Sequence, residues 1–254
     1  MSQDVLWEGD TAYGHFSVVD GLYDNRPARV LYSGEQKAAQ SGIAKDDNSN
    51  LLFDYNQRLL ELAQYLRPQR ILVIGGGALT LPTALLKVLP ETRLDVVELD
   101  PGLTNLAYTY FDAPVDDRLA VAHTDGRSFL SRTAQTYDLI IVDAFAGSSI
   151  PRELKTVEAF QAYGGKLTPD GVVAMNVISA YNGRGSHIVR EILAAAGLSF
   201  TAVELFLASH GYSRWLPQNF VVAAQKQAGL GLQGILRYDI EQLNDVSSEE
   251  ALHD

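Results

Sequence analysis

Acidic residues follow several apolar segments in the middle of this chain, at positions where they could bind a small molecule. The residues are Gly75, Gly76 and Gly77 after the segment 70–74, and Glu98, Asp125 and Asp143 after the segments that follow. Ligands of doubly wound α/β sheets lie along the carboxyl ends of the strands, so the residue after each strand faces the ligand. A glycine-rich turn also lets the backbone come close to that ligand. The pattern therefore predicts a nucleoside-binding site.

Each acid has a predicted place along the ligand. Glu98 lies 21 residues beyond Gly77, where a carboxylate can accept hydrogen bonds from both ribose hydroxyls. We expect Glu98 to face the cleft and to support no core. Asp125 would lie near the base and Asp143 near the reacting end. Asp143 could instead cap a following turn. Asp125 could cap a helix predicted to begin near Gly126, a role that is compatible with binding.

The segments that must position these acids alternate between strand and helix. Apolar runs predict strands at 70–74, 94–98, 119–122, 137–142 and 171–178, and helical spacing predicts helices near 79–89, 102–110, 126–131, 156–166 and 184–196. This alternation implies a parallel sheet with right-handed crossovers. Strands at 200–206 and 219–224 follow with no helical pattern between them, which predicts a terminal antiparallel hairpin. We predict an α/β fold with a doubly wound, mostly parallel, Rossmann-like sheet.

Three regions are predicted along the chain. Residues 1–50 form a small β subdomain in which strands 13–20 and 28–33 make a hairpin joined through 21–27. Residues 51–226, opening with a helix at 51–66, form the nucleoside-binding domain. Residues 227–254 form an acidic tail, with six acids and no Lys or Arg between 239 and 254.

Composition excludes several classes of function. The chain has 254 residues, a net charge of −11 and no cysteine, so disulfides, thiolate metal sites and a cysteine nucleophile are excluded. Five histidines without ligand spacing predict that there is no metal site. The acidic charge argues against a nucleic-acid partner. No long apolar run and no signal-peptide pattern occur, so we expect no membrane association and a cytoplasmic protein. The oligomeric state stays open, with a homodimer as one option.

The glycine turn favours a nucleoside sulfonium over a dinucleotide. Thr80 stands where the third glycine of Gly-x-Gly-x-x-Gly permits close helix packing around a pyrophosphate. A sulfonium donor such as S-adenosylmethionine has no pyrophosphate to bind. The terminal hairpin agrees, because it suits the sheet of S-adenosylmethionine-dependent transferases better than that of dinucleotide dehydrogenases.

From Gly75 onward the chain resembles the spermidine synthase family, in particular its spermidine-synthase-like bacterial branch. The matching segments include Val73-Ile-Gly-Gly-Gly77, Val97-Glu-Leu-Asp-Pro101, Asp125-Gly-Arg-Ser-Phe129, Tyr137-Asp-Leu-Ile-Ile-Val-Asp-Ala-Phe145 and Ile150-Pro-Arg-Glu-Leu154. Gln40-Ser41-Gly42 and Phe53-Asp-Tyr55 are similar to two upstream segments of the family. Taken together, these motifs cover roughly residues 13–224.

The resemblance implies a site for decarboxylated S-adenosylmethionine and for a small-molecule amine, with no metal. In that site Glu98 would hold the ribose, Asp125 with Gly126 the adenine, and Gln40, expected in a loop, the sulfonium side. Asp143 and Tyr55 would handle the attacking amine, although Tyr55 also falls in an apolar helical stripe and could be a core residue.

Three polyamine contacts of the family are absent. Ala78 replaces the Asp that grips the amino group of the aminopropyl chain, Ala146 replaces the second Asp of an Asp-x-x-Asp loop, and Asn56 replaces a His. The donor class is therefore better supported than the amine.

Four functions stay open at this point. The first is a transferase that moves an aminopropyl group to an amine: the positive charge moves to the amine nitrogen, and a carboxylate there, Asp143, stabilises the transition state. The second is an S-adenosylmethionine-dependent methyltransferase, since Ala78 cannot repel the carboxylate of that donor. The third is a non-catalytic nucleoside-binding homologue. A nicotinamide-dependent dehydrogenase comes last, because of Thr80 and the terminal hairpin.

Overall fold

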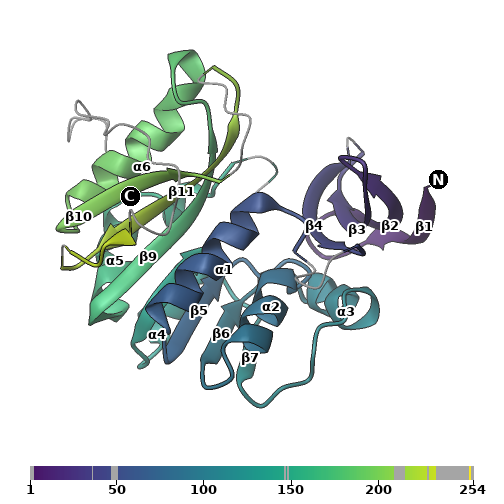
Figure 1. The fold of residues 1–254 in the computed structure, drawn as a ribbon, viewed down its shortest axis with the longest axis horizontal. Coiled ribbons are helices and arrows are strands. Elements are labelled where there is room, and N and C mark those ends of the chain that lie inside the picture. The colour runs from purple at the N-terminus through teal and green to yellow at the C-terminus, as the bar shows by residue number, and fades with distance from the viewer. Residues whose placement is uncertain are drawn as a thin grey trace.

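The fold consists of a seven-stranded sheet covered by helices and a separate four-stranded sheet at the N-terminus (Figure 1). The structure is a computed structural model that describes residues 3–35, 37–46, 51–145, 147, 149–208, 215–227, 229–232 and 252. The predicted tail, 227–254, falls mostly outside these residues, and so does Ala146. The boundaries 1–50, 51–226 and 227–254 stay predictions.

The larger sheet confirms the predicted alternation and the terminal hairpin. Its order is β10-β11-β9-β8-β5-β6-β7, with the strands β5 (Arg70–Ile74), β6 (Arg93–Val97), β7 (Leu119–Ala122), β8 (Tyr137–Val142), β9 (Leu167–Ser179), β10 (Ala202–Leu207) and β11 (Gln218–Gln225). Strands β5 to β9 are parallel, and β11 is antiparallel to both of its neighbours, β9 and β10. The order reverses between β5 and β8, which is where doubly wound sheets bind their ligands.

Helices cover both faces of this sheet. They are α1 (Asp54–Leu66), α2 (Thr80–Val88), α3 (Pro101–Tyr110), α4 (Gly126–Arg132), α5 (Val157–Lys166) and α6 (His187–Gly197), with short 3-10 helices η1 (Arg152–Leu154) and η2 (Gly183–Ser186). Alternate side chains of β5 point to opposite faces, as the period of a strand requires. Val73 packs in one core cluster with residues of α1, α2 and α3, and Leu72 in another with residues of α4, α5 and α6. The doubly wound arrangement is thereby confirmed.

The N-terminal sheet is larger than the predicted hairpin. Strands β2 (His15–Tyr23) and β3 (Arg26–Ser33) form that hairpin, and β1 (Asp4–Asp10) and β4 (Ala38–Ala44) add a strand on each side. The expected connection through 21–27 is only a two-residue turn, Asp24–Asn25, with φ values of 47° and 65°. Turns with positive φ at both central residues match the twist of paired strands, so the two strands run longer than expected.

Candidate active site

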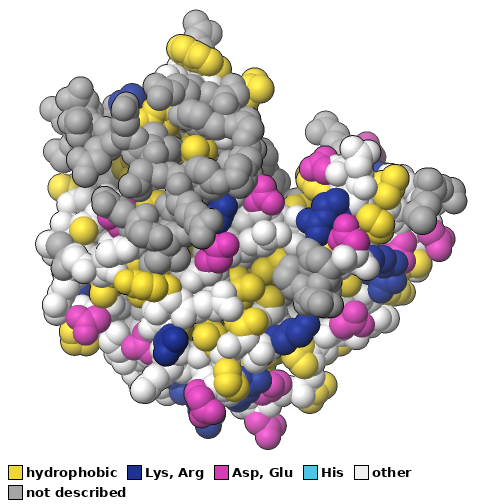
Figure 2. All heavy atoms as spheres, in the orientation of Figure 1, with side chains coloured by type: hydrophobic (Ala, Val, Ile, Leu, Met, Phe, Trp, Pro, Cys, Tyr) yellow, Lys and Arg dark blue, Asp and Glu magenta, His cyan; other side chains and the backbone are white. Residues whose placement is uncertain are grey.

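A cavity of about 1110 Å³ lies at the carboxyl ends of β5, β6 and β8 and is also lined by the N-terminal sheet. In the space-filling view, the outline of the molecule is notched between the N-terminal sheet and the part of the molecule that contains α6, β10 and β11 (Figure 2). The nine predicted site residues all line this cavity: Gln40, Tyr55, Gly75, Gly76, Gly77, Glu98, Asp125, Gly126 and Asp143. The structure therefore brings them together, while the role of each stays a prediction.

The glycine loop, residues 75–79, needs its glycines for close packing. Gly75 has φ 95°, and a Cβ there would collide with the Asp143 carbonyl oxygen. Gly77 has φ 50°, and its Cβ would lie 2.5 Å from Ser41 Oγ on β4. Left-handed conformations are strained for residues other than glycine. The loop therefore depends on these glycines to pass between β8 and the N-terminal sheet.

The amides of the glycine loop are occupied within the protein. Gly75 N–H donates to the Val97 carbonyl (2.9 Å), Gly76 and Gly77 N–H to Glu98 Oε2 (2.9 and 2.7 Å), Ala78 N–H to Ser41 Oγ (3.1 Å) and Leu79 N–H to the Gly76 carbonyl (2.8 Å). An anionic group of a ligand would therefore have to displace one of these acceptors to reach a loop amide.

Glu98 lines the cavity as expected, but it is also buried and holds the loop in place, so the expectation that it supports no core is wrong. The residue is only 7% exposed, and its Oε1 accepts a third backbone bond from Asp100 N–H (2.9 Å). Burial raises the pKa of Glu98 above its ordinary value, and the three backbone donors oppose that rise. Carboxylate oxygens have two lone pairs each, so Glu98 can hold the loop and still accept from a ribose.

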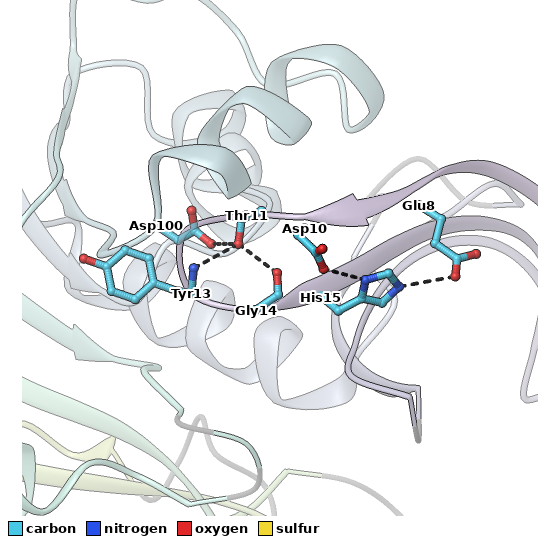
Figure 3. A network of polar contacts seen from close by, with 7 residues as sticks. All are labelled: Glu8, Asp10, Thr11, Tyr13, Gly14, His15 and Asp100. Atoms are coloured by element: carbon cyan, nitrogen blue, oxygen red, sulfur yellow. Dashed lines mark hydrogen bonds and ion pairs between the residues drawn. The ribbon is translucent and has the colours of Figure 1, made fainter.

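The predicted ribose end of the cavity is joined to the N-terminal sheet through Asp100. This residue caps α3, accepting from Gly102 N–H at 2.8 Å, and its Oδ2 lies 2.5 Å from the hydroxyl oxygen of Thr11 (Figure 3). Thr11 follows β1 directly, so this contact links the small sheet to the cavity edge of the large one.

Asp125 both caps a helix and lines the cavity, so its two predicted roles stay compatible. Its Oδ1 accepts from Ser128 N–H at 2.9 Å at the start of α4, which leaves Oδ2 for a ligand. Gly126 is buried beside it, and a Cβ there would lie 2.7 Å from a methyl group of Ile74. The predicted adenine end thus requires a small residue next to the acid.

Asp143 and Tyr55 meet at the predicted reacting end. The Tyr55 hydroxyl lies near the Asp143 carboxyl, and Asn176 Nδ2 donates to Asp143 Oδ1 at 2.7 Å. Burial raises the pKa of Asp143 to about 7, against the opposing effect of the bonds from Asn176 and Tyr55. Burial, and then the neighbouring Asp143, raise the pKa of Tyr55 well above its usual range. A carboxyl group with this pKa can take up and release a proton near neutral pH.

The N-terminal sheet and α1 supply the other side of the reacting end. The Tyr55 ring stacks on Phe53 with centroids 5.9 Å apart, and Tyr23 of β2 meets Phe53 edge-on at 5.5 Å. The side chain of Tyr55 therefore belongs to an aromatic wall of the cavity rather than to the core alone. Gln40 lies on strand β4 and not in the expected loop. The sequence does not reveal this strand, because β4 forms through its pairing with β3.

The lining of the cavity is strongly acidic. Seven carboxylates line it: Asp24, Asp54, Glu98, Asp100, Asp125, Asp143 and Glu153. Among the residues that the structure describes, the lining contains no Lys or Arg. His15 is held between Asp10 and Glu8 (Figure 3), and its hydrogen bonds to those acids raise its pKa. The electrostatic field of such a cavity favours cationic ligands over anionic ones.

Two asparagines at the reacting end were not predicted as site residues. Asn176 on β9 is 1% exposed, and Asn219 on β11 donates from its Nδ2 to Asn176 Oδ1 at 2.9 Å. The sequence does contain a signal: Asn176 interrupts the apolar run 172–178, where an amide without a partner would be costly. An amide in a buried strand therefore indicates a polar partner.

The described residues offer neither a metal site nor a membrane-spanning helix. They contain no cluster of three or more His, Asp or Glu that could hold a metal ion. In the same residues, no helix is long and apolar enough to cross a membrane.

Comparison with known proteins identifies the family. The model of the spermine/spermidine synthase domain matches residues 53–208, so the chain belongs to the spermine/spermidine synthase family. It is 30% identical over 183 residues to a probable polyamine aminopropyl transferase of Bifidobacterium longum, a match that covers 72% of this chain and 40% of the relative. It is also 36% identical over 185 residues to an N-terminal histidine N-methyltransferase of Emericella nidulans, covering 66% of this chain and 32% of that protein.

A solved structure confirms the fold. The structure of a probable spermidine synthase from Corynebacterium glutamicum superposes with a TM-score of 0.75 at 23% identity, covering 87% of this chain and 80% of that one. The chain spans two fifths or less of the length of the two curated relatives above.

Proposed function

We propose that this protein is a transferase that moves an aminopropyl group from decarboxylated S-adenosylmethionine to a small-molecule amine. The observation that carries the proposal is the acidic lining of the cavity, which holds seven carboxylates and, among the described residues, no Lys or Arg. Both proposed substrates are cations, and neither contains a carboxylate. Membership of the spermine/spermidine synthase family supports the same reaction class.

The glycine loop supports a donor without a carboxylate. Its amides from Gly75 to Leu79 already donate within the protein. The carboxylate of S-adenosylmethionine would therefore enter an acidic cavity with no loop amide to receive it, and a buried charge without donors is costly. In our proposal Glu98 holds the ribose, Asp125 and Gly126 the adenine, and Gln40 the sulfonium side.

The proposed reaction is a single displacement in which Asp143 takes the proton. A bond forms between the amine nitrogen and the aminopropyl carbon beside sulfur. The carbon–sulfur bond breaks, and its electron pair stays on sulfur, which leaves neutral methylthioadenosine. The nitrogen becomes positively charged and gives one proton to the Asp143 carboxylate, which Tyr55 orients. A carboxyl pKa of about 7 leaves Asp143 partly ionised at neutral pH, so its carboxylate is available to take the proton.

The acceptor is expected to differ from putrescine. Ala78 is fully buried, does not line the cavity and has no polar side chain, so it cannot anchor an amino group with a carboxylate. Ala146 lies outside the described residues. We expect transfer to putrescine to be weak.

Methyl transfer from S-adenosylmethionine is the second candidate. The similarity to an N-methyltransferase and the apolar Ala78 favour it, since Ala78 would not repel the donor's carboxylate. The same reacting group, Asp143, would serve that chemistry. The choice therefore depends on the donor.

Calorimetric titration with four ligands tests the donor. We expect methylthioadenosine and decarboxylated S-adenosylmethionine to bind, S-adenosylmethionine to bind about tenfold more weakly or worse, and NAD not to bind. The tenfold estimate corresponds to ~1.4 kcal/mol, within the cost of leaving a carboxylate without donors.

Each other outcome points to a different function. Tighter binding of S-adenosylmethionine than of its decarboxylated form would favour the methyltransferase. Binding of NAD without methylthioadenosine would exclude a sulfonium donor. If methylthioadenosine binds but no amine is ever modified, the protein is a nucleoside-binding homologue without catalysis.

A further inference from the structure

Two asparagines connect Asp143 to the far edge of the cavity. Asn176 Nδ2 donates to Asp143 Oδ1 at 2.7 Å, and Asn219 Nδ2 donates to Asn176 Oδ1 at 2.9 Å. The bonds run from β11 through β9 to the end of β8, and all three residues line the cavity. They form one continuous chain of hydrogen bonds that ends on the proposed proton acceptor.

The register of the sheet places these side chains together. In the antiparallel pair β9–β11, Asn176 is opposite Val221 and Asn219 is opposite Ile178, so the asparagines are diagonal neighbours on one face. In the parallel pair β8–β9, Val142 is opposite Met175. Asp143 and Asn176 each follow one residue later, which brings the carboxylate beside the amide.

The direction of the bonds matters for the chemistry. An amide has one donating end and one accepting end, and either could face the carboxylate. Because Asn219 donates to the oxygen of Asn176, the NH₂ group of Asn176 is the end that faces Asp143. With the reverse orientation, an oxygen would face the carboxylate and would favour its protonated form.

The polar groups next to the Asp143 carboxyl in the described structure are neutral. The Asn176 amide from β9 donates to it, and the Tyr55 hydroxyl from α1 lies near it. Charged groups of the same lining, Glu98 and Asp125, follow other strands and are engaged with backbone amides. Of the two neutral neighbours, Asn176 opposes the effect of burial on the pKa of Asp143 more strongly.

We propose that Asn176 and Asn219 are positioning residues for the transfer reaction: Asn219 fixes the amide orientation of Asn176, and Asn176 holds the Asp143 carboxylate in the orientation and ionised form that accept the amine proton. This inference rests on the proposed function for the identity of the reacting group. The hydrogen-bond chain itself does not depend on it.

The test is the titration of the Asp143 carboxyl carbon by NMR in the full chain labelled with ¹³C-aspartate. The resonance is assigned by its loss in Asp143→Asn. The wild-type midpoint is expected at a pH of about 7. Asn176→Leu is expected to raise the midpoint by about one unit, because a donor to the carboxylate is removed. Asn219→Ala should raise it by less and, in the Asn176→Leu background, should add nothing further.

Gln225→Leu is the matched control. Gln225 lies on β11 like Asn219, is 2% exposed and donates to Glu204 at 3.0 Å, but it does not line the cavity. Its variant loses a buried amide on the same strand but away from the cavity. The midpoint of the Asp143 titration should therefore not change. An unchanged midpoint in folded Asn176→Leu, or an equal rise in Gln225→Leu, overturns the proposal. If Asn176→Leu does not fold, Asn219→Ala decides alone: no rise overturns the proposal.

Turnover separates this inference from the proposed function. The NMR titration needs no substrate, so a protein that transfers nothing still reports whether the amide chain controls Asp143. Where the wild type transfers an aminopropyl group, both asparagine variants should lower kcat, shift its pH profile upward and leave the KM for the donor unchanged. A lower kcat with an unshifted pH profile would indicate a merely structural role and would overturn the proposal.

Discussion

Asp143→Asn is expected to lower the rate of amine transfer by about 10³-fold while the affinity for methylthioadenosine stays within about threefold of wild type. Asparagine has nearly the same shape but cannot take a proton from the attacking amine or offset its developing charge. The predicted nucleoside contacts, Glu98 and Asp125, follow other strands, so they should survive. Single-turnover rates and calorimetry with methylthioadenosine measure the two effects separately.

Asp138→Asn is the control on the same strand. Asp138 lies at the opposite end of β8 and accepts from Gln69 and Arg70 N–H (2.8 and 3.0 Å) and from the Thr168 hydroxyl (3.0 Å). It should lower the free energy of unfolding and leave the rate of transfer unchanged. Transfer by Asp143→Asn within tenfold of wild type would remove Asp143 from the mechanism.

The pH dependence of stability provides a check that does not need a substrate. The pKa of Asp143 rises on folding from 3.8 to about 7, so between these pH values the folded protein binds more protons than the unfolded chain. Its contribution to stability therefore falls as pH rises through this range. Asp143→Asn removes the titrating group, so the variant should gain stability relative to wild type as pH rises from about 4 to about 7. The difference in stability between wild type and variant therefore measures the effect of Asp143 on folding, separately from its effect on the reaction.

Glu98→Gln is expected to weaken methylthioadenosine binding by about 10–100-fold and to destabilise the fold. Charge-assisted bonds to the ribose are worth roughly 1.5–3 kcal/mol, and the variant weakens them. The carboxylate also accepts three backbone N–H groups, and the NH₂ group of glutamine cannot replace an accepting oxygen. Thermal unfolding and calorimetry below the unfolding range of the variant measure both losses.

Glu153→Gln is the control for charge alone. Glu153 also lines the cavity but lies in η1, away from the strand-end acids. It should change the affinity by less than about threefold, since its carboxylate holds no part of the glycine loop. Normal nucleoside affinity in folded Glu98→Gln would leave Glu98 with a structural role only.

The sequence predicts the larger sheet well because its signals are local. Each of its strands contains a short apolar stretch, and in a parallel sheet all the carboxyl ends meet at one edge. That rule alone brings Gly75, Glu98, Asp125 and Asp143 to one cavity. The reversal of strand order between β5 and β8 then places Asp143 beside the glycine loop.

The remaining features depend on pairing between distant segments. β4 consists mostly of small residues, Ala-Ala-Gln-Ser-Gly-Ile-Ala, which are weak strand formers and pair only because β3 offers an edge. The Asn219–Asn176 contact depends on the β9–β11 register, and Glu98 holds the glycine loop only once that loop has closed over β6. The amide in the apolar run 172–178 indicates that Asn176 has a polar partner, but nothing in nearby sequence identifies the partner in any of these contacts.

In the proposed reaction, an aminopropyl group moves from a sulfonium donor to an amine. The most direct measurement is mass spectrometry of the products formed from decarboxylated S-adenosylmethionine, isotopically labelled in its aminopropyl chain, with a panel of monoamines and diamines. We predict that the label appears in one or more amines, with one methylthioadenosine released per label transferred. The account would be contradicted if no amine in the panel acquires the label. Methylated amines should then form when S-adenosylmethionine labelled in its methyl group is supplied instead.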